Sequence, residues 1–430
     1  MIDLKLLRTS PDAVRTALAR RGDAAVLTLV AELEALELQR RTLTGQLDQL
    51  KAERNAYAKS DAEHVKQHGK LAADLVEQRK QHGLRINTVE HELRNIESIL
   101  TAKALFVPNL PLPDVPDGGE AGNRVVRAWG TPRPADPAAL KPHWDVAERL
   151  GVLDLARGVK VAGSGFPLFV GSGARLVRGL INFMIDVHVR EHGYVELEPP
   201  LLVKRETMQG TGQLPKFEDD AYRTGDDLFL VPTAEVPVTN VHRDEILDGA
   251  RLPIAYTAYT PCFRREAGAA GKDTRGLLRV HQFDKVELVR FCRPEDSARE
   301  LEELTGHAEA ILQRLELPYR VKLLAAGDTG FASAKTYDLE TWAPGVAAWL
   351  EVSSASCFTD FQARRAGVRF RARSGDKPEF VHTLNASGVA LPRTIAALLE
   401  HRQEADGSVT LPPALVPYVG TDRLLPAGAA

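Results

Sequence analysis

The residues that could do chemistry gather in the stretch Pro261–Leu288, which reads as two strands joined by a long loop. Arg264 and Glu266 stand two positions apart, so they are expected to share one face of the first strand. The same parity places Phe283 and Glu287 together on the return strand. An arginine fork can hold a phosphate and an aromatic ring can stack on a base. These residues therefore predict a binding surface for a nucleotide and a small zwitterion.

The loop between the two expected strands is rich in glycine and in basic residues. Its glycines are Gly268, Gly271 and Gly276, and its basic residues are Lys272 and Arg275, with Arg264 and Arg265 just before it. It is longer than the roughly 2–5 residues of most hairpin loops. Long loops of this composition commonly cover an anionic ligand, so we expect this one to close over a nucleotide.

Two further segments could contribute to a phosphate site. The sequence LEVSSAS places Glu351 and Ser354 at the end of a strand, where hard oxygen donors beside a triphosphate suit Mg²⁺. Taken alone, the same segment could be an edge strand with polar caps. The sequence NASG at 385–388 precedes Arg393 at the start of a helix, where a cation complements a phosphate or is an ordinary surface residue.

A third segment, LVPTAEVPV, carries Thr233 and Glu235 between prolines. We expect it to be extended and to present the carboxylate of Glu235 rigidly to an ammonium group. No GxxxxGK[ST] sequence and no strand-linked GxGxxG sequence is present, so neither standard phosphate-loop fold is supported. ATP, if it is used, must bind by another route.

Length and composition limit the classes of protein that remain. The 430 residues favour two domains, and the net charge of −3 restricts nucleic-acid binding to local patches. The cysteines, Cys262, Cys292 and Cys357, are far apart and form no CxxC pair, so neither a disulfide framework nor a structural zinc site is expected. No apolar run approaches the roughly 20 residues that span a bilayer. We therefore expect a cytoplasmic protein without membrane contact.

The N-terminal quarter has the pattern of a helical hairpin. A short helical cap over about 1–25, with a helix start at Ser10, precedes a heptad pattern over about 27–102. The apolar positions of the first run, broken only by Arg40, are Leu29, Leu33, Leu36, Leu43, Leu47, Leu50 and Tyr57. Those of the second run are Leu75, Ile86, Val89, Leu93, Ile96 and Leu100, with Arg79 and His82 at two expected apolar positions. The basic faces of such a hairpin could grip a phosphate backbone, or be a solvated, salt-bridged surface or a dimerisation arm. Periodicity does not choose between these alternatives.

A proline-rich segment near 105–125 marks the domain boundary, and mixed elements follow it. Helices are expected at 143–154, at 295–315 with Pro294 at the entry, and at 393–405, with a strand running into a long helix over 165–193. Strands are expected at 194–203, 227–233, 253–263, 278–291, 319–324 and 347–358. Pro199 and Pro200 would lie at a sheet edge or interface. This order predicts an α+β fold with an antiparallel sheet.

Together these motifs resemble the bacterial-type seryl-tRNA synthetases, which are class II aminoacyl-tRNA synthetases, over essentially the whole chain. LEPPLLV with Pro200, FRREAGAAGKDTRGLLRVHQFDKVE and NASGVALPRT resemble the three class II motifs, near 175–202, 256–289 and 383–404. TAE at 233–235 and EVSS at 351–354 resemble segments of the seryl branch. The resemblance implies a tRNA-binding domain over 1–108, a catalytic domain over 109–430 with a class II antiparallel sheet flanked by helices, and a homodimer.

The resemblance also implies roles for matching residues. Catalytic roles would fall to Arg264, Glu266 and Arg393; ATP would contact these and Arg265, Val280, Phe283, Glu351, Val352, Ser353 and Ser354. Serine would contact Thr233, Ala234, Glu235, Arg264, Glu287 and Ser387, with Glu287 accepting the hydroxyl, and Glu351 and Ser354 would bind Mg²⁺. The third motif departs from the family at Ala386 and Pro392, where glycine is common.

The implied activity is a serine–tRNA ligase that uses ATP and Mg²⁺ and charges serine tRNA, and selenocysteine tRNA where one is present. A related ligase for carrier proteins would lack the long arm. A non-catalytic paralogue that only binds RNA would have lost residues such as Arg264, Phe283 and Arg393, which are present. A zinc-dependent mode of serine recognition is disfavoured by the scattered cysteines.

Overall fold

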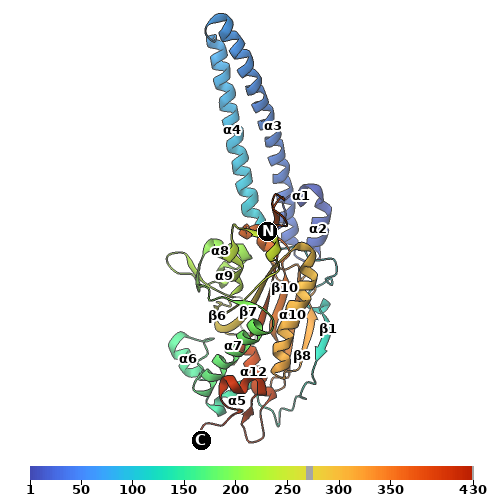
Figure 1. Cartoon of the computed structure of the whole chain (residues 1–430), viewed down its shortest axis with the longest axis vertical. Coiled ribbons are helices and arrows are strands. Elements are labelled where there is room, and N and C mark those ends of the chain that lie inside the picture. Colours follow the sequence, from blue (N-terminus) through green and yellow to red (C-terminus); the bar gives the residue numbers. More distant parts are fainter. Residues whose placement is uncertain (268–274, 429–430) are drawn as a thin grey trace. The chain divides into compact units, whose positions relative to one another are not determined.

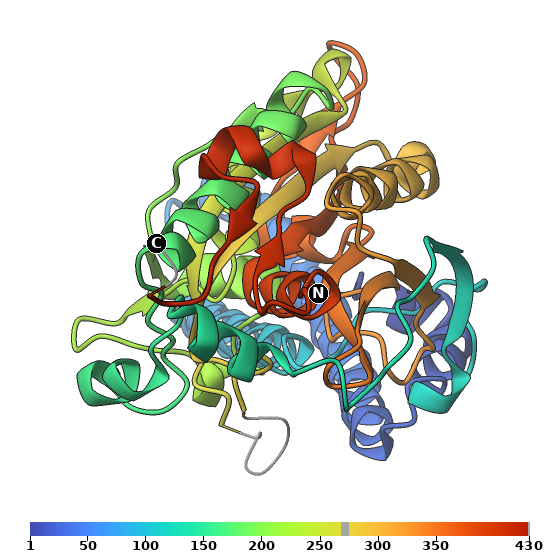
Figure 2. The same ribbon diagram turned by 90° about the horizontal axis from the view of Figure 1, so that it is seen from below.

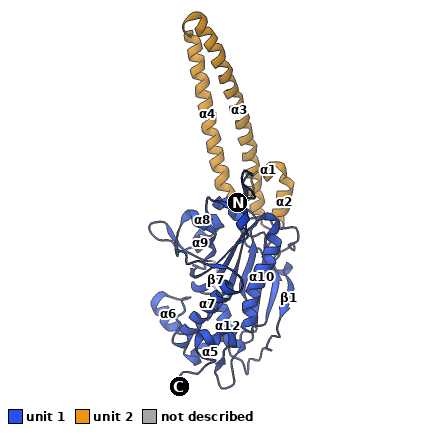
Figure 3. Cartoon of the chain, viewed as in Figure 1, with its two compact units in different colours: residues 1, 20–22, 109–430 blue, residues 2–19, 23–108 orange. Residues whose placement is uncertain are grey.

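A computed structural model of the chain describes residues 1–267 and 275–428. Gly268, Gly271 and Lys272 of the expected ligand-covering loop lie outside the described residues. The chain forms two compact units (Figure 3). One consists of Ile2–Ala19 and Asp23–Pro108; the other consists of Met1, Arg20–Gly22 and Asn109–Ala430.

The N-terminal unit is the predicted helical cap and hairpin. It consists of α1 (Leu6–Thr9), α2 (Pro11–Ala19), α3 (Ala24–His68) and α4 (Ala73–Ala104), and α3 and α4 pack side by side (Figure 1). The side chain of Asp23 caps α3 by accepting a hydrogen bond from the Ala25 amide, and Gly69 ends the helix with a φ of 78°. With 45 residues, α3 is about 67 Å long.

Two polar interruptions of the heptad pattern, Arg79 and His82, form a polar layer between α3 and α4, in which His82 is buried and Arg79 is partly exposed. His82 lies between the helices, with its Nε2 2.8 Å from the Leu50 carbonyl oxygen. Arg79 pairs with Asp61 at 2.8 Å and lies 3.9 Å above the ring of Tyr57. Both side chains therefore occupy the helix interface as their register predicts, because each finds a polar partner there.

The other unit is built on an eight-stranded sheet, with strand order β1-β8-β9-β10-β13-β7-β6-β2. Its strands are β1 (Arg124–Trp129), β2 (Val195–Glu196), β6 (Ile254–Phe263), β7 (Gln282–Cys292), β8 (Tyr319–Leu323), β9 (Lys335–Ala343), β10 (Ala348–Cys357) and β13 (His382–Ala390). Every neighbouring pair is antiparallel except β2 and β6. The predicted antiparallel α+β fold is confirmed.

Helices cover one face of this sheet. They include α7 (Ser172–Arg190) and α10 (Ser297–Arg314), which lie beside each other (Figure 2), and α12 (Leu391–His401) packs against β7, β9 and β10. The apolar core lies between these helices and the sheet, and Val286 and Leu288 of β7 belong to it. Since side chains alternate along a strand, the intervening residues of β7 face the opposite side.

Shorter elements complete this unit. The helices are α5 (His143–Leu150), α6 (Leu155–Ala162), α8 (Arg205–Thr211), α9 (Glu235–Thr239), α11 (Phe361–Ala366) and α13 (Val416–Val419). The strands are β3 (Leu202–Lys204), β4 (Leu228–Leu230), β5 (Ile246–Asp248), β11 (Arg369–Arg371), β12 (Glu379–Phe380), β14 (Val409–Thr410) and β15 (Arg423–Leu424). Across the described ranges, no helix combines the length and the apolar character needed to cross a membrane.

Three local predictions were wrong. Glu235 begins the short helix α9 instead of lying on an extended segment, because Pro237 stands in the first helical turn, where proline removes no hydrogen bond. No strand leads into α7; Phe169 forms only an isolated bridge with Leu153. The chain leaves β6 at Phe263, so strand parity does not place Arg264 and Glu266 on one face.

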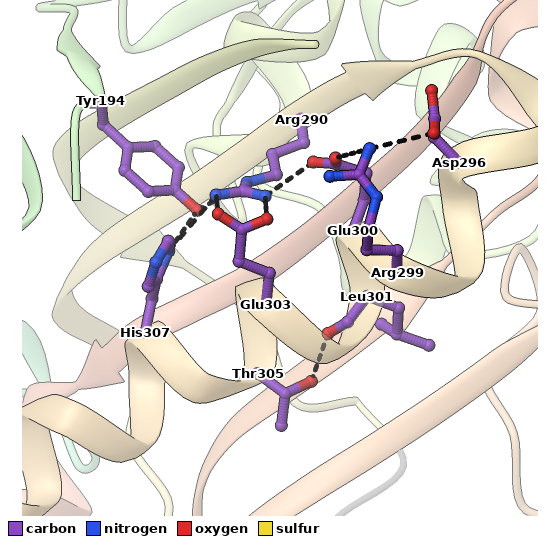
Figure 4. A network of polar contacts seen from close by, with 9 residues as sticks. All are labelled: Tyr194, Arg290, Asp296, Arg299, Glu300, Leu301, Glu303, Thr305 and His307. Carbon is purple, nitrogen blue, oxygen red and sulfur yellow. Dashed lines mark hydrogen bonds and ion pairs between the residues drawn. The ribbon is translucent and has the colours of Figure 1, made fainter.

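A buried ion-pair network fixes β7 to α10 behind the sheet (Figure 4). Arg290 of β7 pairs with Glu300 at 2.6 Å and with Glu303 at 3.2 Å, and donates to the hydroxyl of Tyr194 at 2.9 Å. That hydroxyl lies 3.1 Å from Nδ1 of His307. The network holds in place the strand whose other face carries the predicted site residues.

Candidate active site

A cavity of about 470 Å³ opens on the face of the sheet opposite α7 and α10, a size suited to a small-molecule ligand. Most of the predicted site residues line it: Thr233, Glu235, Arg264, Glu266, Val280, Phe283, Glu287, Glu351, Val352, Ser353, Ser354, Ser387 and Arg393. Two predicted residues do not. Arg265 is exposed, and Ala234 is fully buried in an apolar cluster.

Strand β7 positions one side of the cavity. Phe283, Lys285 and Glu287 alternate with core residues and all three line the cavity. Lys285 Nζ lies 2.5 Å from Glu287 Oε2, and both side chains are almost completely buried. Sequence reasoning named Phe283 and Glu287 but missed Lys285, although the same parity places it between them.

Arg264 lies above the ring of Phe283, although it is not on a strand. Its Cζ is 5.1 Å from the ring centroid, within the range of a cation–π contact. Its position is fixed through its backbone, because its amide donates to the His281 carbonyl oxygen at 2.9 Å and its own carbonyl lies 3.0 Å from His281 Nδ1. Arg264 and Phe283 are therefore close, as expected, but hydrogen bonds with His281 hold Arg264 there instead of strand pairing.

Glu266 also reaches the cavity from an irregular segment. Its φ of 50° lies in the left-handed region, where a side chain other than glycine is strained. Arg279 Nη1 donates to its Oε2 at 2.5 Å. Arg279 lines the cavity but was not named as a site residue, although the strand expected over 278–291 gives it the parity of Phe283; in the structure it lies before β7, which begins at Gln282.

Strand β10 and helix α12 supply the opposite side. Arg393 Nη1 donates to the Glu351 carbonyl oxygen and its Nε donates to the Leu278 carbonyl oxygen, each at 3.0 Å. The carboxylate of Glu351 lies 3.6 Å from Arg393 and is about half exposed. The pairing of β10 with β9 shifts register between Glu351 and Ser353, which brings Glu351, Ser353 and Ser354 to the cavity together.

A second register shift lies in β13 beside Ser387. The ladder with β7 is interrupted between Ser387 and Val389, and His188 of α7 packs against the intervening Gly388. A Cβ added to Gly388 would lie 2.6 Å from His188 Nε2, so this position requires glycine. The Ser387 carbonyl accepts a hydrogen bond from Ser353 Oγ at 2.6 Å. The irregular strand thereby joins the two sides of the cavity.

The two departures from the family's third motif fit this backbone. Ala386 is fully buried in the apolar core behind the sheet. Pro392 stands in the first turn of α12, where it removes no helical hydrogen bond. Neither position therefore requires glycine, and Arg393 still lines the cavity.

Two acidic side chains are buried at the inner end of the cavity. Burial, reinforced by the neighbouring Glu287, raises the pKa of Glu235 to about 7. Burial also raises the pKa of Glu287, while Lys285 opposes that rise. Two carboxyl groups held at this cost would be stabilised by a cationic group of a ligand.

The charges of the cavity suit a ligand that carries both signs. Arg264, Arg279 and Arg393 provide guanidinium groups that can bind phosphate oxygens or a carboxylate. Glu235 and Glu287 provide acceptors for an ammonium and a hydroxyl group. None of these groups is placed as an activated nucleophile, and the arrangement can instead bind and orient two substrates for direct reaction.

Comparisons with known proteins agree with this fold. The model of the seryl-tRNA synthetase N-terminal domain matches residues 1–111, and that of the class II tRNA synthetase core domain (G, H, P, S and T) matches residues 216–402. A serine–tRNA ligase of Gemmatimonas aurantiaca is 57% identical, over 98% of this chain and 99% of its own.

Solved structures show the same similarity. The seryl-tRNA synthetase of Pyrococcus horikoshii complexed with ATP is 38% identical, with a TM-score of 0.95 over 99% of this chain and 100% of that one. A cytoplasmic serine–tRNA ligase of Naegleria fowleri in complex with AMP is 31% identical, with a TM-score of 0.88 over 100% and 99%. The chain is a member of the seryl-tRNA synthetase family of class II aminoacyl-tRNA synthetases.

Proposed function

We propose that the chain is a serine–tRNA ligase that activates L-serine with ATP and transfers the seryl group to the 3′ end of serine tRNA. The observation that carries the proposal is the cavity itself, in which an arginine–aromatic pair and two buried carboxylates face one space. Serine-dependent exchange of pyrophosphate into ATP tests the first half of the reaction. Charging of serine tRNA tests the second, and activity with selenocysteine tRNA stays a prediction.

The amino acid would occupy the buried acidic end. Glu235 would accept the ammonium group, with Thr233 beside it, since the Thr233 hydroxyl already receives the Glu235 amide at 3.2 Å. Glu287 would accept the hydroxyl group, and Ser387, its direct partner on the neighbouring strand β13, would complete that contact. Arg264 would bind the carboxylate. A site built to bond a hydroxyl rejects analogues without one by roughly 10⁴-fold or more.

ATP would occupy the arginine-lined part. Phe283 would stack on adenine beside Val280, while Arg264, Arg393 and Glu266 would bind the phosphate and ribose region. Arg265 is exposed and its amide donates to the Asp220 carbonyl at 2.9 Å. We therefore assign no ATP contact to Arg265, although sequence reasoning included it.

The residues beside Arg393 fit Mg²⁺ in the form that accompanies ATP. Ser354 and Glu351 offer oxygen donors, and Asp338, paired with Ser354 across β9 and β10, has a buried Oδ1 without a hydrogen-bond partner in the described part of the chain. Burial and the nearby Glu351 raise the pKa of Asp338, a cost that a cation would remove. Among the described residues, no group of three His, Cys, Asp or Glu side chains could hold a metal ion by itself. Phosphate oxygens of ATP would therefore complete the coordination shell of Mg²⁺.

The proposed reaction needs no covalent enzyme intermediate. A carboxylate oxygen of serine attacks the α-phosphorus of ATP, the bond to the β-phosphate oxygen breaks, and pyrophosphate leaves. A hydroxyl of the tRNA's terminal ribose then attacks the seryl carbonyl and AMP leaves. Arg264 and Arg393 would orient the phosphates and offset the developing charge, and Mg²⁺ bound at Glu351 and Ser354 would add further charge neutralisation.

The α3–α4 hairpin would bind tRNA. Its family model is that of the seryl-tRNA synthetase N-terminal domain, and lysine and arginine side chains are distributed along both helices. Double-helical RNA is recognised mainly by its shape and backbone, which such a charged helical surface can contact without reading bases. The ion pairs Lys51–Glu90 and Arg79–Asp61 would keep the hairpin rigid during that contact.

The catalytic unit would form a homodimer through the segment that contains Pro200. Strand β2 forms one edge of the large sheet, and its Val195 is 57% exposed. Nearby, Leu201 is 39% exposed and Leu202 is 47% exposed. An exposed apolar sheet edge is normally covered by a partner. Sedimentation equilibrium should give twice the mass of one chain, and a stable monomer at micromolar concentration would exclude this interface.

A further inference from the structure

A fully buried glutamine supports Glu235 from behind the cavity wall. Gln362 lies on α11, and its Nε2 donates to Glu235 Oε1 at 2.6 Å. The same nitrogen donates to the Thr211 carbonyl oxygen at 3.2 Å. The hydroxyl of Thr383, on β13, donates to Gln362 Oε1 at 2.7 Å. Through Gln362, these bonds connect Glu235 to α8, α11 and β13.

The partners fix which end of the amide faces Glu235. A carbonyl oxygen can only accept hydrogen bonds, so the atom that faces Thr211 must be the amide nitrogen. The amide oxygen then faces Thr383, whose hydroxyl must donate to it. Gln362 therefore presents an N–H group to Glu235, and an N–H group binds an ionised carboxylate more strongly than a protonated one.

This contact occupies one carboxylate oxygen and leaves the other for the cavity. Glu235 is 7% exposed, and the small accessible part of its side chain lines the cavity. An anchored carboxylate has fewer orientations to lose when a ligand binds. The substrate's ammonium group would therefore meet an acceptor that is already oriented.

The groups around Glu235 shift its pKa in opposite directions. Burial and Glu287 raise its pKa, whereas the hydrogen bond from Gln362 and the charges of Lys285 and Arg264 lower it. The result, about 7, leaves the carboxyl group divided between its two forms near neutral pH. Removal of the Gln362 contact would move the balance toward the protonated form, which cannot bind a cation.

We propose that Gln362 is a positioning residue for the amino-acid substrate: it holds Glu235 as an oriented carboxylate for the ammonium group, and Thr383 fixes the orientation of its amide. This inference rests on the proposed function, since it concerns the serine end of the same cavity. The side chain of Gln362 touches neither substrate and acts only through Glu235.

The test is steady-state pyrophosphate exchange with Gln362→Leu, measured between pH 6 and 8.5. A hydrogen bond to a charged group contributes enough to predict a rise of about 10- to 150-fold in the KM for serine. The KM for ATP and kcat should stay within about threefold of the wild type. The acid limb of kcat/KM for serine should move to higher pH, so the defect should shrink as the pH rises.

Thr383 provides an independent pair of variants in case Gln362→Leu does not fold. Thr383→Val keeps the shape but removes the hydroxyl, and it should raise the KM for serine in the same direction but by less. Thr383→Ser keeps the hydroxyl and should remain near the wild type. Equal behaviour of Thr383→Val and Thr383→Ser would overturn the role of the amide's orientation.

Gln403 supplies the matched control, because it is a buried glutamine outside the cavity. Its Nε2 donates to the carbonyl oxygens of Lys141 and Glu400, each at 2.9 Å. Gln403→Leu should lower the thermal midpoint without changing the KM for serine or the pH profile. An unchanged KM and profile in Gln362→Leu, or equal losses for ATP and serine, would overturn the inference. Absence of exchange in the wild type would instead refute the proposed function.

Discussion

At the scale of single residues, the pairing of Arg264 with Phe283 defines the end of the cavity that we propose for the nucleotide. The guanidinium group lies over the ring, so a base that stacks on Phe283 would share the site with a phosphate-binding cation. Phe283 was predictable because it alternates with the core residues of β7. The approach of Arg264 was predicted for the wrong reason, since a backbone contact with His281 holds it instead of a strand.

Phe283→Ala should weaken ATP binding and leave serine binding nearly unchanged. Base–aromatic stacking contributes roughly 1–3 kcal/mol, which corresponds to a rise of about 5- to 150-fold in the KM for ATP. Phe283→Tyr keeps the ring and should behave like the wild type. Exchange kinetics with ATP and serine varied separately give both constants. A larger effect on serine than on ATP would place the nucleotide elsewhere.

Residues that act through others are the hardest to find from a sequence. Gln362 lies 127 positions from Glu235, and no periodic pattern relates them. Lys285 could have been predicted, because its parity on β7 is that of Phe283 and Glu287. Arg279 has the same parity within the strand expected over 278–291, but β7 begins only at Gln282, so the contact of Arg279 with Glu266 could not be predicted from that strand.

At the scale of elements, β7 combines two functions on its two faces. One face lines the cavity, and the other anchors the strand to α10 through Arg290, Glu300 and Glu303 (Figure 4). His192 and His307 stack 4.0 Å apart beside this network. Burial, with His192 and Arg290 nearby, lowers the pKa of His307 to about 4.

This cluster should make folding sensitive to acid. His307 is neutral in the folded chain down to about pH 4, whereas an unfolded histidine binds a proton near pH 6.5. The unfolded state therefore binds more protons in that range, and the stabilisation present above pH 6.5 is lost as the pH falls toward 4. His307→Phe keeps a ring for stacking and should give a shallower decline of the unfolding free energy. Denaturant unfolding at several pH values measures it; an identical slope would exclude this contribution.

Elements with strong periodicity were predictable, and irregular ones were not. The heptads fixed α3 and α4 closely enough to place Arg79 and His82 at the helix interface. Strands β9 and β13 were missed, although both alternate: Tyr337 and Leu339 of β9 belong to the core, and Asp338 and Glu340 lie between and beyond them. The register shifts at Glu351 and Gly388 depend on neighbouring strands, so a single sequence does not reveal them.

At the scale of the whole molecule, the two units divide the proposed reaction. All residues that line the cavity belong to the unit containing Asn109–Ala430, and the hairpin belongs to the other. Adenylate formation would therefore need only the unit that contains Asn109–Ala430, whereas tRNA charging would need both units.

Deletion of residues 30–100 should separate these activities. Serine-dependent pyrophosphate exchange should remain within about tenfold of the wild type, because the deletion removes no cavity residue. Charging of serine tRNA should fall by at least about 10²-fold, since phosphate contacts dominate the affinity of nucleic-acid binding. Both rates are measured on one preparation. Equal losses of the two activities would mean that the hairpin has only a structural role.

We propose that this cavity selects serine and activates it with ATP. The most direct measurement is pyrophosphate exchange with serine, alanine and threonine, for the wild type, for Glu287→Ala and for the exposed control Glu148→Ala. We expect the wild type and the control to prefer serine over alanine by roughly 10⁴-fold, and Glu287→Ala to lose most of this preference because the hydroxyl no longer has its buried acceptor. Exchange that does not depend on serine in the wild type, or a preference unchanged in Glu287→Ala, would contradict this role of the cavity.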